Sequence, residues 1–143
     1  MKRKSYSPRE KDMSSVIPIH NAVNERTWAS ILQWERPYAT ALACPGGPKL
    51  VSFQGDSSKL SPRARFYGLL GYERPFDRHD WVVDRCGTRV EYLIDFYQGK
   101  NKAGVQHMGP SFYLDVRPKL NTWEGIRMRM LRATGLEQSV KDE

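Results

Sequence analysis

The alternation of apolar and polar side chains is most regular in the second half of the chain, where it predicts β-structure. In residues 88–97 apolar or aromatic side chains occupy every second position, which is typical of a strand with one buried face. Residues 81–84 and 112–117 have similar compositions, and Gly87 can supply a turn with positive φ. The pattern predicts a small antiparallel sheet of about three strands. One face should be buried: Trp81, Val90, Tyr92, Ile94, Phe96, Leu114 and Val116.

Two helices are predicted from a capping residue that is followed by proline. Ser7-Pro8 and Ser61-Pro62 each place an N-cap residue before proline at the first helical position. We therefore expect helices over residues 8–17 and 63–70, and Gly71 should end the second of them. Pro18 should interrupt the first of them, because proline lacks the backbone N–H that a helix interior uses.

Two further helices are predicted from apolar residues that recur every three or four positions. The first precedes Pro37, and the second spans residues 121–133 with Asn121 as its cap. The face of the first is formed by Val23, Thr27, Ile31 and Trp34. Residues 44–60 are rich in Gly, Pro and Ser and are interpreted as a loop with at most a short strand at 50–53. The order of N-terminal helices, antiparallel strands and a C-terminal helix indicates an α+β domain.

Length and composition fit one modest domain. The 143 residues fall within the range of a single domain, assigned here to 1–143 with frayed tails at 1–6 and 136–143. Sixteen aromatic residues (4 Trp, 7 Tyr and 5 Phe) supply much of the core volume. No stretch approaches the ~18 apolar residues of a membrane span. The basic start also lacks the apolar segment of a signal peptide.

The net charge of +7 implies an anionic partner, such as nucleic acid, lipid head groups, an acidic protein or the carboxylates of a ligand. The sequence has no phosphate-binding glycine loop and no His-Glu-x-x-His motif. It also lacks Cys-x-x-Cys-His, so the chain does not itself carry covalent haem. The chain has two cysteines, Cys44 and Cys86, which is too few for a disulfide scaffold or a cysteine zinc site. Cys44 is either a loop cysteine or a thiolate for haem iron.

Two histidines are candidates for chemistry. His20, between Ile19 and Asn21, is either a packed or capping side chain or a neutral imidazole offered to a metal centre. His79 has Asp77 and Asp80 nearby. It is either a loop histidine satisfied by those charges or a group that supports a site.

Seven segments taken together carry more information than any single motif. They are Ile19-His20-Asn21, Ile31-Leu32-x-Trp34-Glu35, Cys44-Pro45-x-Gly47-Pro48, Ser61-Pro62-Arg63-Ala64-Arg65, Gly71-Tyr72-Glu73-x-Pro75-Phe76-Asp77-Arg78-His79-Asp80-Trp81, Arg85-Cys86-Gly87-Thr88 and Asp115-Val116-Arg117-Pro118. Over about residues 15–133, in this order, the chain resembles the cytochrome c-type haem lyases, or holocytochrome c synthases.

This resemblance implies a lyase of the mitochondrial intermembrane space, associated with the inner membrane, that attaches haem to apocytochrome c through two thioether bonds. It implies that His20 is the axial ligand to haem iron and the catalytic residue. His79 matches a second family histidine and is expected to support the haem site. Arginine suits carboxylates, and the candidates for the haem propionates are Arg63, Arg65, Arg78 and Arg85.

The resemblance also implies an upstream region with Cys-Pro motifs and a tryptophan-bearing segment. The sequence as given contains no match to that region. Two functions are therefore considered: a holocytochrome c synthase, and a truncated, catalytically silent haem- or cytochrome-binding module. A nucleic-acid-binding domain is a third alternative, since Phe66, Tyr67 and Trp123 are interleaved with five arginines, Arg63, Arg65, Arg127, Arg129 and Arg132. No RNA-module signature accompanies them, so no nucleic-acid partner is expected.

Overall fold

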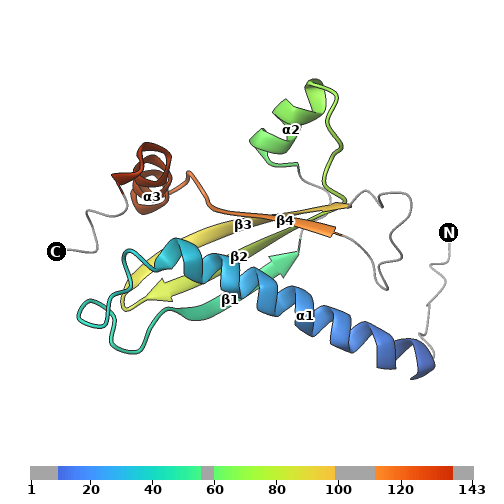
Figure 1. Ribbon diagram of the computed structural model, residues 1–143, viewed down its shortest axis with the longest axis horizontal. Coiled ribbons are helices and arrows are strands. Elements are labelled where there is room, and N and C mark those ends of the chain that lie inside the picture. The colour runs from blue at the N-terminus through green and yellow to red at the C-terminus, as the bar shows by residue number, and fades with distance from the viewer. Residues whose placement is uncertain (1–9, 56–59, 99–111, 137–143) are drawn as a thin grey trace, which may run out of the picture.

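The computed structural model describes residues 10–55, 60–98 and 112–136, and for residues 10–20 and Gln98 it describes the backbone alone. These residues form three helices and one four-stranded antiparallel sheet with the strand order β1-β2-β3-β4 (Figure 1). The elements are α1 (Glu10–Glu35), β1 (Lys49–Gly55), α2 (Pro62–Leu69), β2 (Asp77–Arg85), β3 (Thr88–Gln98), β4 (Phe112–Pro118) and α3 (Trp123–Thr134). The predicted α+β class is confirmed, with one strand more than expected. The expected tails lie outside the described residues, apart from Leu136.

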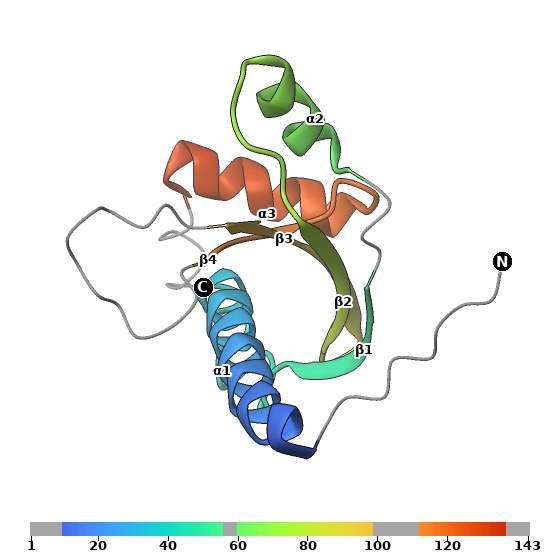
Figure 2. The same ribbon diagram turned by 90° about the vertical axis from the view of Figure 1, so that its right-hand side faces the viewer.

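The sheet is curved, and its two faces are covered differently. Figure 2 shows α1 against the concave side, which we call the inner face, and α2 on the convex side, which we call the outer face. The helix α3 follows β4 at the end of the sheet (Figure 1), where its Met128 joins the core and its Arg132 lies over the Trp34 ring of α1 at 3.9 Å. The Nε1 of Trp34 in α1 donates a 2.7 Å hydrogen bond to the carbonyl oxygen of Val116 in β4. The Oγ of Ser61, at the start of α2, donates to the outer-face carboxylate of Asp95 at 2.8 Å.

The core lies between the inner face and α1, as the alternating pattern predicted. In the register of the sheet Trp81 pairs with Tyr92, and Ile94 pairs with Val116. Six of the seven residues predicted for this face are buried, and Leu114 is partly buried against them. The chain reverses between β2 and β3 through a two-residue turn. Cys86 and Gly87 have φ values of 46° and 100°, and positive φ at both positions is the pattern of a type I′ hairpin.

The sequence prediction for β1 and for the start of β2 was incomplete. The short strand considered at 50–53 extends over residues 49–55 as an edge strand paired with β2, with a register shift between Leu50 and Ser52. Every residue of β1 is exposed, so no buried alternation marked it in the sequence. β2 begins at Asp77 rather than Trp81, because its first four residues pair with β3 although most of their side chains are charged.

The predicted interruption of the first helix at Pro18 is wrong. The backbone is helical without a break through Glu10–Glu35. A proline has a φ compatible with the helix, and its missing N–H removes a single intrahelical hydrogen bond. One long helix therefore carries residues 10–35, including position 20.

The ends of α2 follow the predicted capping pattern. Ser61 Oγ accepts a hydrogen bond from the backbone N–H of Ala64 at 3.1 Å. At the other end Gly71 adopts a φ of 89°, and the N–H of Tyr72 donates to the carbonyl oxygen of Tyr67 at 3.0 Å. This is a Schellman ending, for which glycine is favoured.

The start of α3 differs from the prediction, because Thr122 is its cap and not Asn121. Thr122 Oγ1 accepts from the N–H of Gly125 at 3.1 Å, while Asn121 Nδ2 donates to Glu91 at 2.6 Å. A Cβ at position 125 would lie 1.9 Å from the carbonyl oxygen of Lys119, which no side chain tolerates. Glycine is therefore required where α3 approaches the end of β4.

The two cysteines form a disulfide, so Cys44 is a loop cysteine as predicted, and the alternative of a haem thiolate is wrong. Cys44 and Cys86 are 42 positions apart, but their Cα atoms lie 5.4 Å from each other. The loop after α1 and the β2–β3 turn come together there, a proximity that local spacing does not reveal. The disulfide ties the loop that follows α1 to the β2–β3 turn.

Candidate functional site

A buried ion-pair cluster fixes α1 on the sheet. Glu35, at the end of α1, is fully buried. Its Oε1 accepts from the hydroxyl of Tyr92, and its Oε2 accepts from Arg85 Nε at 2.5 Å. Arg85 Nη1 also donates to Glu124 of α3 at 2.7 Å. These four residues, Glu35, Arg85, Tyr92 and Glu124, connect four elements (α1, β2, β3 and α3) and set the position of the helix that carries His20.

Two of these groups have shifted pKa values. Burial opposes the charge of Arg85, but hydrogen bonds and charges from Glu35 and Glu124 outweigh it and raise the arginine's pKa. Burial, followed by the charge of Glu35, raises the pKa of the Tyr92 hydroxyl. Arg85 was a candidate for a haem propionate, and its guanidinium is instead engaged by two internal carboxylates.

His79 lies on the inner face and is held by a carboxylate. It pairs with Ile94 across the β2–β3 ladder, and its Nε2 is 3.0 Å from an oxygen of Asp77. Its ring meets the ring of Phe96 at a centroid distance of 4.8 Å. A carboxylate at this distance fixes the orientation of an imidazole, as the supporting role predicted for His79 requires.

Aromatic side chains beside His79 are partly open. Phe53 pairs with Trp81 and shares its face, yet the side chain is 70% exposed. Phe76 is also exposed, and its ring centroid lies 6.2 Å from that of Phe96. We call Phe53, Phe76, His79 and Phe96 the inner aromatic surface. An apolar aromatic surface of this kind suits the face of a flat, apolar ligand.

The side chain of His20 lies outside the described side chains, so its role as iron ligand stays a prediction. Position 20 belongs to α1. Later in the same helix, the side chains of Thr27 and Ile31 are buried.

The other three arginines predicted for the propionates do not share a face with His79. Arg78 precedes His79 in β2 and therefore lies on the outer face, where its Nε is 3.3 Å from Asp80. Arg63, at the start of α2, is 3.6 Å from Asp115. Arg65 is exposed and forms no ion pair within the described residues. The candidate site thus divides between two sides of the sheet.

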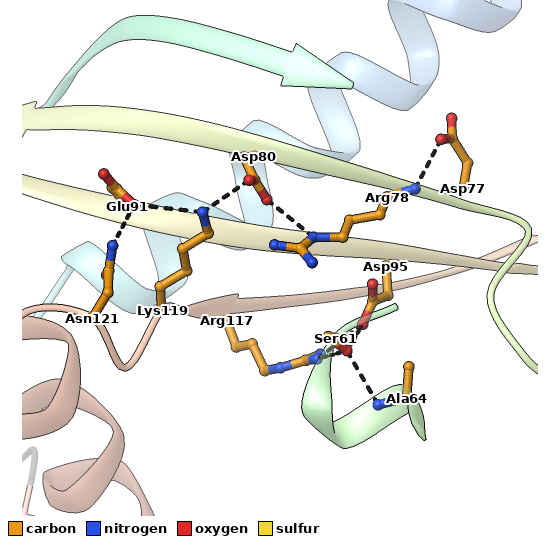
Figure 3. A network of polar contacts seen from close by, with 10 residues as sticks. All are labelled: Ser61, Ala64, Asp77, Arg78, Asp80, Glu91, Asp95, Arg117, Lys119 and Asn121. Carbon is orange, nitrogen blue, oxygen red and sulfur yellow. Dashed lines mark hydrogen bonds and ion pairs between the residues drawn. The ribbon is translucent and has the colours of Figure 1, made fainter. Parts of the chain in front are cut away.

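The outer face carries an ionic network that was not predicted from the sequence (Figure 3). Arg117 is only 3% exposed and binds Asp95 at 2.9 Å and the Ser61 hydroxyl at 2.8 Å. Lys119 binds Asp80 at 2.8 Å and Glu91 at 3.5 Å. The contributing residues come from five separate segments, so no local spacing could have indicated the network.

A pocket of about 350 Å³ opens on this outer face, between α2, the sheet and α3. We call it the outer pocket. Its charged lining residues are Arg63, Arg78, Arg117, Lys119 and Arg129. Sequence analysis considered Arg129 only as part of a solvated or nucleic-acid-binding face.

Two other features, a metal site built from protein side chains and a membrane-spanning helix, were also sought in the described residues. Among the side chains that the structure describes, no group of three or more His, Cys, Asp or Glu could hold a metal ion. No helix in the described part of the chain is long and apolar enough to span a membrane.

Comparison with known proteins identifies relatives over nearly the whole chain. A putative holocytochrome-c1 synthase of Chaetomium thermophilum is 60% identical over 141 residues, which cover 95% of this chain and 48% of the relative. A putative holocytochrome-c1 synthase of Schizosaccharomyces pombe is 54% identical, over 94% of this chain and 59% of the relative. The holocytochrome c-type synthase of Bos taurus is 47% identical, over 85% of this chain and 42% of the relative.

The chain thus spans about half the length of the curated relatives that it matches. No solved structure matches it. The family model described as cytochrome c/c1 heme lyase matches residues 1–133. The resemblance noted in the sequence is therefore confirmed, and this chain belongs to the cytochrome c/c1 haem lyase family.

Proposed function

We propose that this protein is a holocytochrome c synthase, a lyase that joins haem to a c-type apocytochrome through thioether bonds. The observation that carries the proposal is 60% identity to a putative holocytochrome-c1 synthase across 95% of the chain. The family match over residues 1–133 supports the same reaction. Haem and the apocytochrome are both substrates in this proposal.

We propose apocytochrome c1 as the first substrate protein to test, with apocytochrome c as the second. The two relatives with 60% and 54% identity are named putative holocytochrome-c1 synthases, and the cattle relative with 47% identity is named a c-type synthase. Similarity therefore favours the c1 substrate.

The chemistry requires alignment more than an enzyme nucleophile. Each cysteine thiol of the substrate's Cys-x-x-Cys-His adds across one haem vinyl group, so a carbon–sulfur bond forms and no group leaves. Holding thiol and vinyl in register can supply ~7–11 kcal/mol of the barrier. This chain's contribution would be to bind haem, orient it and present it to the substrate polypeptide.

In this proposal His20 supplies the axial imidazole, and the inner aromatic surface receives part of the porphyrin face. Position 20 belongs to α1, the helix whose Thr27 and Ile31 are buried. His79 supports the site through its contact with Asp77. The ion-pair cluster at Glu35 holds α1 in place and so sets where position 20 lies.

Arg63, Arg65 and Arg78 remain the predicted partners of the haem propionates. Arg63 and Arg78 line the outer pocket. Because Arg78 and His79 point to opposite faces of β2, we do not expect one haem to contact both side chains directly. Propionate recognition and support by His79 are therefore separable in experiments.

We propose that the protein works in the mitochondrial intermembrane space, associated with the inner membrane. The support in the structure is α2, which buries only Ala64. Leu69 is 84% exposed, and Phe66, Leu70 and Tyr72 are exposed as well. Exposed apolar and aromatic residues on a basic protein suit the surface of an anionic membrane.

The test is co-production of the chain with haem and apocytochrome c1. The expected result is haem that stays with the cytochrome after acid–acetone extraction. Haem that binds the chain but is never attached covalently would indicate the catalytically silent binding module instead.

The role of His20 is tested separately by the Soret spectrum of the bound haem. His20→Ala and His20→Gly are expected to change the ligation. His107→Ala serves as the control, because His107 is the third histidine of the chain and is not predicted to take part in the site. An unchanged spectrum in both His20 variants would remove this residue from the site.

A further inference from the structure

We propose that the outer pocket binds a small ligand that carries a carboxylate or phosphate group, and that Arg129 is its principal unpaired cation. Nothing in the family match assigns a ligand to this pocket. The inference goes beyond the proposed function. Only one version of it, in which the carboxylate belongs to a porphyrin, rests on the proposed function.

The lining of the pocket is selective for an anion. Ten residues form it; five are cationic, and none is acidic. The cations come from α2, β2, β4, the segment after β4, and α3, so their convergence is produced by the fold. Apolar surface from Pro62, Leu93 and Leu120 lies between them. A volume of about 350 Å³ lies at the lower end of the range for small-molecule sites.

The carboxylates around the pocket do not neutralise all of its cations. Asp80 is shared by Arg78 and Lys119. Asp115 is shared in the same way by Arg63 and Arg117. The remaining acids of the network are Asp95, which is fully buried beside Arg117, and Glu91, which lies near Lys119. With Arg129, five cations thus face four carboxylates.

Arg129 has no carboxylate partner among the described residues. Its Nη1 reaches only the carbonyl oxygen of Pro118, at 3.5 Å. Burial, and then the positive charges of Arg117 and Arg63, lower the pKa of Arg129, while the charge of Asp115 acts in the opposite direction. Guanidinium stays charged at neutral pH all the same. An incoming oxyanion would supply the missing partner.

The site is also preorganised. Arg117 is almost fully buried and held by Asp95 and Ser61, so it does not need to be ordered when a ligand arrives. Two or more guanidinium groups that face one cavity can bind an oxyanion through paired N–H donors. A carboxylate and a phosphate meet this requirement equally well, and the carboxylate could be the propionate arm of a porphyrin.

The experiment measures binding to the purified chain at constant ionic strength by isothermal titration calorimetry. Three probes are used: inorganic pyrophosphate, iron-free mesoporphyrin, and mesoporphyrin dimethyl ester. Arg129→Gln should weaken binding of the preferred probe by about tenfold or more, as expected for loss of a charged hydrogen bond. Arg127→Gln is the matched control, because Arg127 lies on the same helix, pairs with Glu124 and does not line the pocket.

Each outcome either distinguishes a phosphate ligand from a porphyrin carboxylate or rejects the outer pocket as a binding site. Arg129-dependent binding of pyrophosphate supports a phosphate ligand. Arg129-dependent binding of mesoporphyrin but not of its ester supports a propionate. Absence of binding by all three probes, or equal effects of the Arg129 and Arg127 variants, overturns the proposal. The probes contain no iron and no thiol is present, so such a failure leaves the His20 test and the proposed lyase reaction untouched.

Discussion

Replacing Glu35 by glutamine tests whether the buried ion-pair cluster holds α1 on the sheet. The substitution preserves the shape of the side chain and removes its negative charge. Glu35 receives two donors, the Tyr92 hydroxyl and Arg85 Nε. Glutamine has one acceptor oxygen, so one of these donors must face its NH₂ group.

The expected cost follows from the burial of these groups. Removing one partner of a buried ion pair costs ~3–5 kcal/mol, because the other charge stays behind in the interior. Arg85 keeps its 2.7 Å contact with Glu124, which partly compensates the charge. We therefore expect Glu35→Gln to lower the free energy of unfolding by about 3 kcal/mol, the lower end of that range.

Urea unfolding followed by tryptophan fluorescence measures this loss, since Trp81 is buried in the core. Glu91→Gln is the matched control. Its ion pair with Lys119 is partly exposed at 3.5 Å, and pairs of this kind contribute at most ~1 kcal/mol. A loss below ~1 kcal/mol for Glu35→Gln, or equal losses for the two variants, would show that the cluster does not anchor the helix.

Three further predictions concern stability. Ile94→Ala should cost ~2–5 kcal/mol in urea unfolding because the side chain is fully buried, and a loss of a few tenths would contradict the register of the sheet. Reducing Cys44–Cys86, whose positions are 42 apart, should remove about 4 kcal/mol by the chain-entropy relation; a Cys44→Ala/Cys86→Ala variant should be insensitive to reductant. Tyr92 has a raised pKa when folded, so the unfolded chain loses this proton first as the pH rises. Stability should therefore be complete below about pH 10 and fall above it. Tyr92→Phe should flatten that decline in urea midpoints measured from pH 8 to 11, and an equal decline in the variant would exclude this origin.

The parts of the fold that the sequence predicted are those with a local physical signal. Alternation in β3 identified a buried face that includes Tyr92 and Ile94, and both are fully buried. Ser61 and Gly71 marked the ends of α2 because capping depends on one side chain and one backbone angle.

The parts that were missed depend on contacts between distant segments. β1 has no buried residue, so only its pairing with β2 reveals it as a strand. The charged residues at the start of β2, among them Arg78 and Asp80, look like a loop until the outer-face network gives them partners. The disulfide and the outer pocket join positions far apart in sequence, such as Arg63 and Arg129. The division of the candidate site between two faces was invisible for the same reason.

The close approach at Gly125 has a consequence for how this domain can vary. A methyl group there would overlap the Lys119 carbonyl oxygen, which belongs to the backbone and cannot rotate away. Any larger residue must push α3 outward, and this helix carries both Met128 of the core and Arg129 of the pocket. A single added carbon would thus displace Met128 from the core and Arg129 from the pocket at the same time. A substitution at position 125 therefore cannot alter the packing of the core without also altering the pocket.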